Sequence, residues 1–169
     1  MYCQAIMQLA QNLKAVEIWL DKAEEFAAAK KFDIDVLLNG SLAPDMKPLI
    51  YQVQSASDYV KGGAAWLSGQ KPPRHEDNER TISDLRARIQ KTVAFVESVK
   101  EKQYANAGAQ KVGMSWAPAG KILGGEDYLL QMVIPNAYFH TTMAYAILRQ
   151  HGVAVGKMDF VGSINWIDA

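Results

Sequence analysis

The sequence predicts an all-α protein, a bundle of four long helices with a short hairpin or extended excursion before the last helix. Four segments of about 20 to 27 residues place apolar side chains at helical spacing. Glycine- and proline-rich connections separate these segments, and the third connection is long. This pattern favours a helical bundle, and the chain length suits a single domain over residues 1–169.

The first long helix is predicted at residues 4–29. A helical turn at 34–38 and a loop follow it, because glycine and proline interrupt the pattern. The second long helix is predicted from Pro44 to Ser68, since proline suits a first helical turn. The buried stripes of these two helices are predicted to be Ile6, Leu9, Leu13, Val16, Leu20, Ala23 and Ala27, and Leu49, Val53, Ala56, Val60, Gly63, Ala64 and Leu67.

The third long helix is predicted to begin at about Asn78 or Thr81 and to run to Lys102, and Thr81 forms a capping arrangement with Asp84. Residues 105–125 then change to short apolar runs on either side of a proline and glycine turn. Such runs are typical of a small β-hairpin or an extended excursion. The buried stripe of the third helix is predicted to be Ile82, Leu85, Ile89, Val93, Val96 and Val99.

The last long helix is predicted at residues 127–151. Pro135 removes a backbone donor, which predicts a kink at 131–135, and Gly152 predicts a left-handed cap. The helix is apolar around most of its circumference, which favours burial by several neighbours or a subunit interface, and we therefore expect a homodimer. The tail is expected to fold back on the bundle through Val153, Val155, Phe160 and Trp166.

The charge pattern excludes several classes of partner. Eighteen basic and eighteen acidic side chains are interspersed, so we expect neither nucleic acid nor a membrane surface as a partner. No targeting or membrane-spanning segment is predicted, and the single cysteine, Cys3, fits a reducing compartment. These features together predict a cytoplasmic protein.

The sequence has three histidines that could act in catalysis or bind a metal ion. His75 lies in a charged loop, where an ordinary solvated side chain is expected, and His151 suits the exposed carbonyls at a helix end. His140 and His151 are about 16 Å apart along one helix, too far to share a metal ion. His140 therefore remains as the candidate functional imidazole.

His140 follows Asn136 by four residues, so both side chains lie on one helical face. One interpretation is a buried histidine whose hydrogen bonds come from Asn136 and the second long helix. The other is a weakly bound divalent metal ion or a small polar ligand, although an amide is a poor metal ligand. On the second long helix, one shoulder of the apolar face is polar and carries Asp45, Gln52, Ser55 and Tyr59.

Three strings carry a resemblance to a known family: SLAPDMKPLIYQVQSASDYVKGGAAWLSG at 41–69, DLRARIQKTVAFVES at 84–98 and YLLQMVIPNAYFHTTMAYAILRQHGVAVGKMDFVG at 128–162. They resemble the domain-of-unknown-function family numbered 1993, a branch of the DinB and YfiT superfamily of predicted metalloenzymes. The resemblance implies a DinB-like four-helix bundle with up, down, down, up helix order, often assembled as a homodimer.

The resemblance also implies a site. Superfamily members hold a divalent ion with one histidine on the second helix and two, four residues apart, on the last. The matching positions here are near Gln52 and at Asn136 and His140, so amides stand where two imidazoles are expected. We expect a polar pocket at these three residues, bordered by Asp45 and Tyr59, with His140 as the candidate metal ligand.

The leading expectation is a DinB-like protein that binds a small molecule in this pocket beside a degenerate metal site. The first alternative is a divalent-metal-dependent transferase or hydrolase of the DinB and YfiT type. The second alternative is a structural dimer without catalysis.

Overall fold

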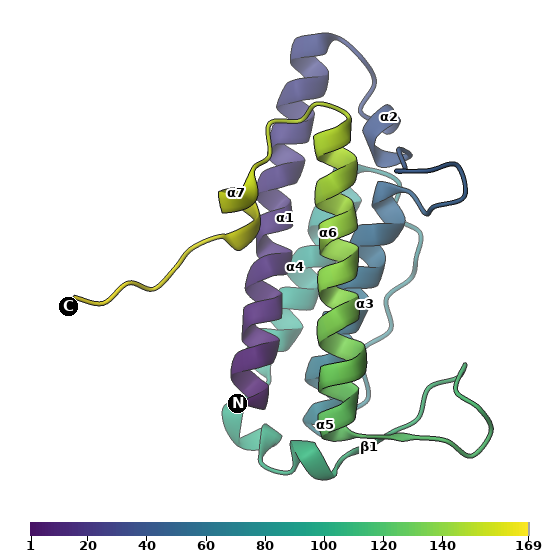
Figure 1. Ribbon diagram of the computed structural model, residues 1–169, viewed down its shortest axis with the longest axis vertical. Helices are drawn as coiled ribbons and strands as arrows, with labels where there is room; N and C mark the ends of the chain where they lie inside the picture. Colours follow the sequence, from purple (N-terminus) through teal and green to yellow (C-terminus); the bar gives the residue numbers. More distant parts are fainter. Residues whose placement is uncertain (169) are drawn as a thin grey trace.

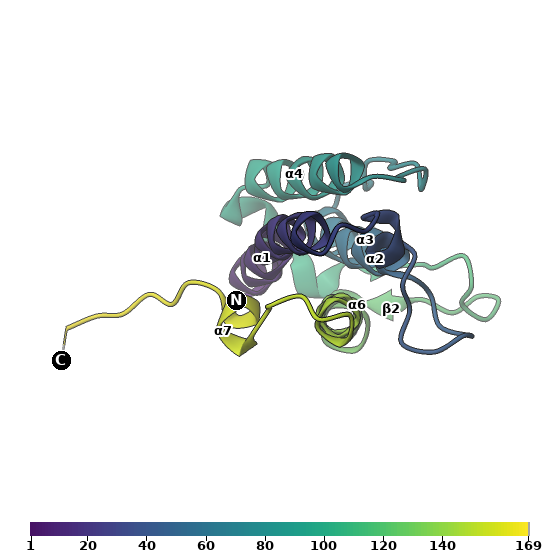
Figure 2. The ribbon, with the colours of Figure 1, turned by 90° about the horizontal axis from the view of Figure 1, so that it is seen from above.

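Four long helices run side by side along the longest axis of the molecule (Figure 1). They are α1 (Tyr2–Lys30), α3 (Leu49–Leu67), α4 (Ile82–Ser98) and α6 (Ile134–Gln150). The computed structural model describes residues 1–168. Viewed along the bundle, α4 covers one side of α1 and α3, and α6 covers the other (Figure 2). The prediction of an all-α bundle of four long helices is therefore confirmed.

The connections between the long helices hold the shorter elements. Strands β1 and β2 pair antiparallel, with Lys111 opposite Gly124 and Val112 opposite Leu123, so the predicted hairpin is present in a minimal form. The hairpin projects from one end of the bundle (Figure 1). The remaining elements are α2 (Asp35–Leu38), the 3₁₀ helices η1 (Glu101–Tyr104) and η2 (Ala107–Ala109), β1 (Lys111–Val112), β2 (Leu123–Gly124), α5 (Gly125–Asp127), the π-helix η3 (Tyr128–Val133) and α7 (Lys157–Val161).

The predicted stripes of the first three long helices are buried throughout. They form two apolar clusters, one around Trp19, Leu85 and Ile147 and the other around Ile6, Val60 and Val133. Buried polar side chains lie between the two clusters in the helix sequences: Asn12 on α1, Ser57 on α3 and Thr141 on α6. These three helices thus each carry a buried polar residue where the two clusters meet, and Thr141 is the neighbour in sequence of His140, a candidate site residue.

Two predicted helix boundaries were wrong. The second long helix begins at Leu49 instead of Pro44, because Pro48 crowds the preceding turn and holds Lys47 out of the helical region. The third helix ends at Ser98 instead of Lys102, and its continuation is the separate 3₁₀ turn η1. The predicted cap is present: the Thr81 hydroxyl accepts from the Asp84 N–H at 3.1 Å, and Asp84 accepts from the Thr81 N–H at 3.0 Å.

The last helix changes its winding where Pro135 predicted an interruption. Residues Tyr128–Val133 form a π-helix, and α6 follows with Pro135 in its first turn. Gly63 of α3 accommodates this stretch, since a Cβ there would lie only 2.7 Å from Val133 Cγ1. Gly152 adopts φ +98° after the helix, as its predicted cap role requires.

The tail folds back only in part. Val153 and Val155 are buried, and the Phe160 ring stacks on Trp19 with centroids 5.7 Å apart, as predicted. The prediction for Trp166 was wrong: its side chain is 84% exposed. Gly162, with φ +72°, ends α7, and the chain then leaves the bundle (Figures 1 and 2).

Within residues 1–168, no helix combines the length and the apolar character that a membrane crossing requires.

Candidate functional site

The candidate site joins the first turn of α3 to α6. His140 Nδ1 lies 2.8 Å from the side-chain oxygen of Gln52, 88 positions earlier in the chain. The Gln52 amide nitrogen donates to the backbone oxygen of Lys47 at 2.9 Å. Gln52 is almost fully buried, and both ends of its amide are engaged. The amide therefore has one fixed orientation and presents its oxygen to the imidazole.

This contact sets the state of the imidazole. Because an amide oxygen can only accept, Nδ1 of His140 carries the proton and donates it to Gln52. Nε2 is then an unprotonated acceptor; it forms no hydrogen bond with residues 1–168 and is not fully enclosed. Burial lowers the pKa of His140 below its ordinary 6.5, so the ring is neutral at pH 7. His140 is thus a positioned, neutral base with one open nitrogen.

Aromatic rings surround this imidazole. Tyr59 stacks on it, with ring centroids 5.8 Å apart and an interplanar angle of 17°. Tyr51 and Phe139 meet its edges, with centroids 6.1 and 5.2 Å away. These contacts explain the desolvation of His140 and hold its ring plane fixed.

A cavity of about 310 Å³ lies on the side of α3 that Tyr59 occupies. Tyr59 lines this cavity and also stacks on His140, so one side chain connects the two. The volume is at the small end of the range found for ligand pockets. The cavity, here called the Tyr59 cavity, is lined by Asp58, Tyr59, Lys61, Gly62, Trp66, Pro72, Met114, Trp116 and Tyr128.

The structure brings only part of the expected pocket together. Gln52, Tyr59 and His140 are in contact, but the Asn136 amide donates to the backbone oxygen of Met132 at 2.7 Å. The Asn136 side chain therefore satisfies a backbone oxygen at the junction of η3 and α6 and does not contact His140 through a hydrogen bond. Asp45 is exposed in the loop before α3, and no hydrogen bond or ion pair joins it to the other described residues.

The donor set does not fit the divalent ion that the superfamily implies. His140 is the one imidazole at the site, and both amide atoms of Gln52 are already used. No group of three or more histidine, cysteine, aspartate or glutamate side chains suited to a metal ion occurs in the described part of the chain. Since a transition metal prefers several imidazole, thiolate or carboxylate ligands, these residues form a hydrogen-bonded pair in place of a metal centre.

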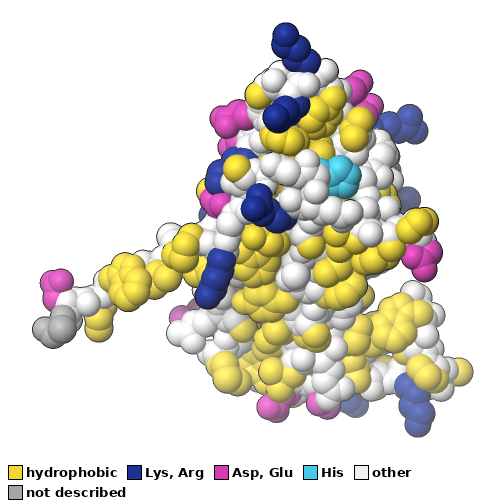
Figure 3. Space-filling view, turned by 45° about the horizontal axis from the view of Figure 1, so that its top comes forward, with side chains coloured by type: hydrophobic (Ala, Val, Ile, Leu, Met, Phe, Trp, Pro, Cys, Tyr) yellow, Lys and Arg dark blue, Asp and Glu magenta, His cyan; other side chains and the backbone are white. Residues whose placement is uncertain are grey.

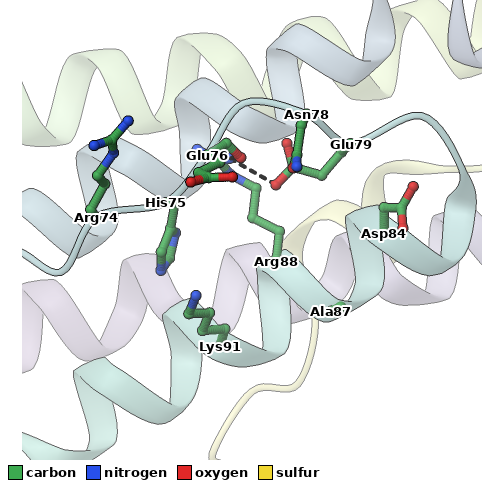
Figure 4. Close-up of a pocket in the computed structure, with 9 residues that line it drawn as sticks. All are labelled: Arg74, His75, Glu76, Asn78, Glu79, Asp84, Ala87, Arg88 and Lys91. Atoms are coloured by element: carbon green, nitrogen blue, oxygen red, sulfur yellow. Dashed lines mark hydrogen bonds and ion pairs between the residues drawn. The ribbon is translucent and has the colours of Figure 1, made fainter.

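A second, larger cavity of about 530 Å³ lies between α4 and the loop that follows α3 (Figure 4). Arg88, whose side chain is 1% exposed, is its central group. The guanidinium pairs with Asp58, Asp77 and Glu79 at 2.9 Å each and contacts the backbone oxygens of Gln54 and Glu76. These charges are committed to one another, so Arg88 holds the loop on α4 and is an architectural group.

His75 in the same loop corrects one prediction. We expected a solvated side chain, but both ring nitrogens are enclosed and have no hydrogen-bond partner in the structure. Burial, followed by the charges of Lys61, Arg88 and Lys91, lowers the pKa of His75 to about 4. The ring is buried because Arg88 binds Glu76, Asp77 and Glu79, the residues that follow His75, and so holds the loop against α4.

Sequence reasoning missed Arg88 and Lys61, although the helical pattern marked both. Arg88 lies between Leu85 and Ile89 on the buried stripe of α4. Lys61 lies between the buried Val60 and Ala64 on α3. A charged residue within an apolar stripe indicates a buried ion pair, because an unpaired charge there is costly.

The fold and the site together define a DinB-like protein: a four-helix bundle in which a polar pair joins the second and fourth long helices. The chain belongs to the family described as Domain of unknown function (DUF1993), whose model matches residues 1–161.

Among solved structures, the chain is similar to a crystal structure of a DinB family member protein from Shewanella denitrificans. The two chains are 42% identical, with a TM-score of 0.94. The match covers 99% of this chain and 95% of the Shewanella chain. No curated protein matches the chain.

Proposed function

We propose that this protein binds a small organic molecule in the Tyr59 cavity, beside an imidazole that works without a metal ion. The observation that carries the proposal is the double role of Tyr59, which lines the cavity and stacks on His140. A ligand in the cavity thus lies against the ring that fixes the imidazole. The open Nε2 of His140 supplies an acceptor or a base at this level of the bundle.

The character of the cavity supports binding of an organic ligand. Its wall combines aromatic and apolar side chains with a few polar groups, which is the usual composition of a small-molecule pocket. Trp116, on the hairpin loop, lines the cavity and is 65% exposed, so its ring is accessible to a ligand.

NMR with a mixture of small one- and two-ring fragments tests the proposal. The indole N–H signals of Trp66 and Trp116 report on the cavity, and those of Trp19 and Trp166 serve as internal references outside it. We expect at least one fragment to shift the first two signals and to leave the references unchanged. If no fragment shifts Trp66 or Trp116, the proposal is wrong.

Two tyrosines provide a matched pair of variants. Tyr59→Ala removes a wall of the cavity and is expected to abolish the fragment shifts. Tyr51→Ala removes another ring that contacts His140 but does not line the cavity, so binding should remain. Equal effects of the two variants would contradict the assigned location.

We also propose that a second copy of the chain covers the outer face of η3 and α6. Leu130 and Phe139 are 56% and 52% exposed on this segment, and Figure 3 shows apolar side chains gathered on the face of the molecule that it displays. Exposed large apolar side chains that gather on one face favour an interface. Sedimentation at micromolar concentration should give a dimer, and Leu130→Glu with Phe139→Glu should give a monomer; a monomeric wild type would contradict this proposal.

A further inference from the structure

The free polar atoms on the wall of the Tyr59 cavity are mainly hydrogen-bond donors. They are the Lys61 ammonium, the hydroxyls of Tyr59 and Tyr128, and the indole N–H groups of Trp66 and Trp116. Neither hydroxyl and neither indole forms a hydrogen bond within residues 1–168. A ligand that presents acceptors can therefore satisfy all five of these groups.

Lys61 is the strongest of these donors. Its side chain is 9% exposed, and its ammonium makes one contact, to Asp58 Oδ1 at 2.6 Å. An ammonium carries three N–H donors, and a buried charge with unused donors is costly. The remaining donors of Lys61 thus favour an anionic group at the cavity.

Asp58 does not cancel this preference. Arg88 binds the same oxygen, Asp58 Oδ1, at 2.9 Å, but its charge is also met by Asp77 and Glu79, so Asp58 engages one of the three N–H donors of Lys61 and leaves the other two. The second oxygen of Asp58 is an acceptor on a side chain that is 42% exposed. An amine ligand would have to compete there with Lys61 and Arg88.

Tyr128 is a donor built into the floor of the cavity. The residue is only 5% exposed, yet its hydroxyl is not fully enclosed and has no partner in the described residues. Burial raises the pKa of Tyr128 to about 12, so the hydroxyl keeps its proton and can donate it. The Tyr128 oxygen lies close to Gly62, since a Cβ at that position would be only 3.0 Å from it.

The rest of the wall suits a flat apolar body. Trp66, Trp116 and Tyr59 present aromatic rings, and Met114 and Pro72 complete the apolar surface. Aromatic side chains pair favourably with other rings in stacked or edge contacts. A volume of about 310 Å³ admits a molecule of one or two rings.

We infer that the ligand class of the Tyr59 cavity is the aromatic carboxylates, with the carboxylate bound by Lys61 and the Tyr128 hydroxyl and the ring held among Trp66, Trp116 and Tyr59. The inference rests on the proposed function, because it names the ligand of the same cavity. Charge-assisted bonds from an ammonium and a phenol to a carboxylate supply the selectivity.

Three probes of one size test the charge preference: benzoate, the neutral benzyl alcohol and the cationic benzylamine. Each is titrated into the labelled full chain, and the Trp66 and Trp116 indole signals are followed. We expect benzoate to bind at least tenfold more tightly than either of the other two. If benzyl alcohol or benzylamine shifts these signals at equal or lower concentration, the ligand class is wrong and the proposed function stands; if no aromatic probe shifts them, both fail.

Variants of single residues distinguish the contribution of the hydrogen-bond donors from that of the apolar wall of the cavity. Lys61→Met keeps the apolar stem and should weaken benzoate binding at least tenfold while leaving benzyl alcohol unchanged; Lys91→Met, a lysine of the other cavity, should change neither. Should Lys61→Met fail to fold, Tyr128→Phe removes one donor without a charge and should lower the preference for benzoate over benzyl alcohol. An unchanged preference in Tyr128→Phe, or in a folded Lys61→Met, would overturn the inference.

Gly62→Ala tests the floor of the cavity. Alanine favours a helix interior by about 1 kcal/mol over glycine, so the variant should not lose stability through the backbone. Its methyl group faces the Tyr128 hydroxyl at 3.0 Å and should weaken benzoate binding at least threefold. Unchanged binding in this variant would contradict the placement of the carboxylate beside Tyr128.

Discussion

His140 Nδ1 and Gln52 Oε1 lie 2.8 Å apart and join the second and fourth long helices. The contact fixes the tautomer of the imidazole and uses the amide that stands where the superfamily pattern expects a second imidazole. The same atoms therefore explain both the orientation of His140 and the poor fit to a metal ion.

Gln52→Met should lower stability. The change removes the acceptor of His140 Nδ1 and the donor to the Lys47 backbone, and it leaves a buried ring nitrogen without a partner. Loss of buried hydrogen bonds of this kind costs about 1 to 3 kcal/mol. Urea unfolding measures the loss, with Gln90→Met as the control, because Gln90 is exposed and bonds only to Glu17. Equal losses in the two variants would contradict the role given to Gln52.

Arg88→Met should be among the most damaging single changes in the chain. It leaves Glu79 without its buried cation and Asp58 with Lys61 alone, and breaking a buried pair costs about 3 to 5 kcal/mol. Arg86→Met is the matched control on the same helix, since its partners Asp21 and Glu24 are more than half exposed and such pairs contribute about 1 kcal/mol or less. Thermal unfolding of both variants compares them; a smaller loss for Arg88→Met than for Arg86→Met would show that Arg88 is not the architectural group.

His75 should make the protein less stable in acid. Its pKa is about 4 in the folded protein and near 6.5 in the unfolded chain, so the unfolded chain binds the proton more tightly. The contribution is complete above pH 6.5 and is lost as the pH falls from 6.5 to about 4. Allowing for screening at a partly exposed side chain, we expect a loss of about 1 to 2 kcal/mol between about pH 7 and about pH 4.

Carboxylates also titrate in this range, so the His75 contribution is isolated by comparison with His75→Asn. The pKa values of Glu79 and Asp159 are lowered in the folded protein, which likewise removes stability in acid. The wild type should lose more stability than His75→Asn over the same interval. Parallel pH profiles for the two proteins would show that His75 titrates normally.

The helices were predictable because their buried side chains recur with the period of the α-helix. The stripes on α1, α3 and α4 depend only on the spacing of residues such as Leu13, Val53 and Ile89, and each proved to be buried. The start of α3 was misplaced because Pro44 and Pro48 both suit a first turn. The choice between them depends on the loop that returns to Gly40, whose oxygen accepts from the Leu49 N–H, and that contact is not local in sequence.

The site was predictable only in its centre. Gln52 and His140 were suggested by the resemblance and by one helical face, and they do meet. The cavity wall could not be foreseen, because Pro72 and Trp116 reach it from irregular connections whose paths depend on tertiary contacts. The position of the Tyr128 hydroxyl could not be predicted, because it depends on a contact with Gly62 of α3 that is not local in sequence.

The most direct test of the proposal that His140 works without a metal ion is the ¹⁵N NMR spectrum of its ring at neutral pH, before and after one equivalent of Zn²⁺. The account predicts a neutral ring with the proton on Nδ1 and a bare Nε2, and the same spectrum when zinc is added. A proton on Nε2, or a zinc-induced shift of a ring nitrogen that disappears in the presence of a chelator, would contradict it.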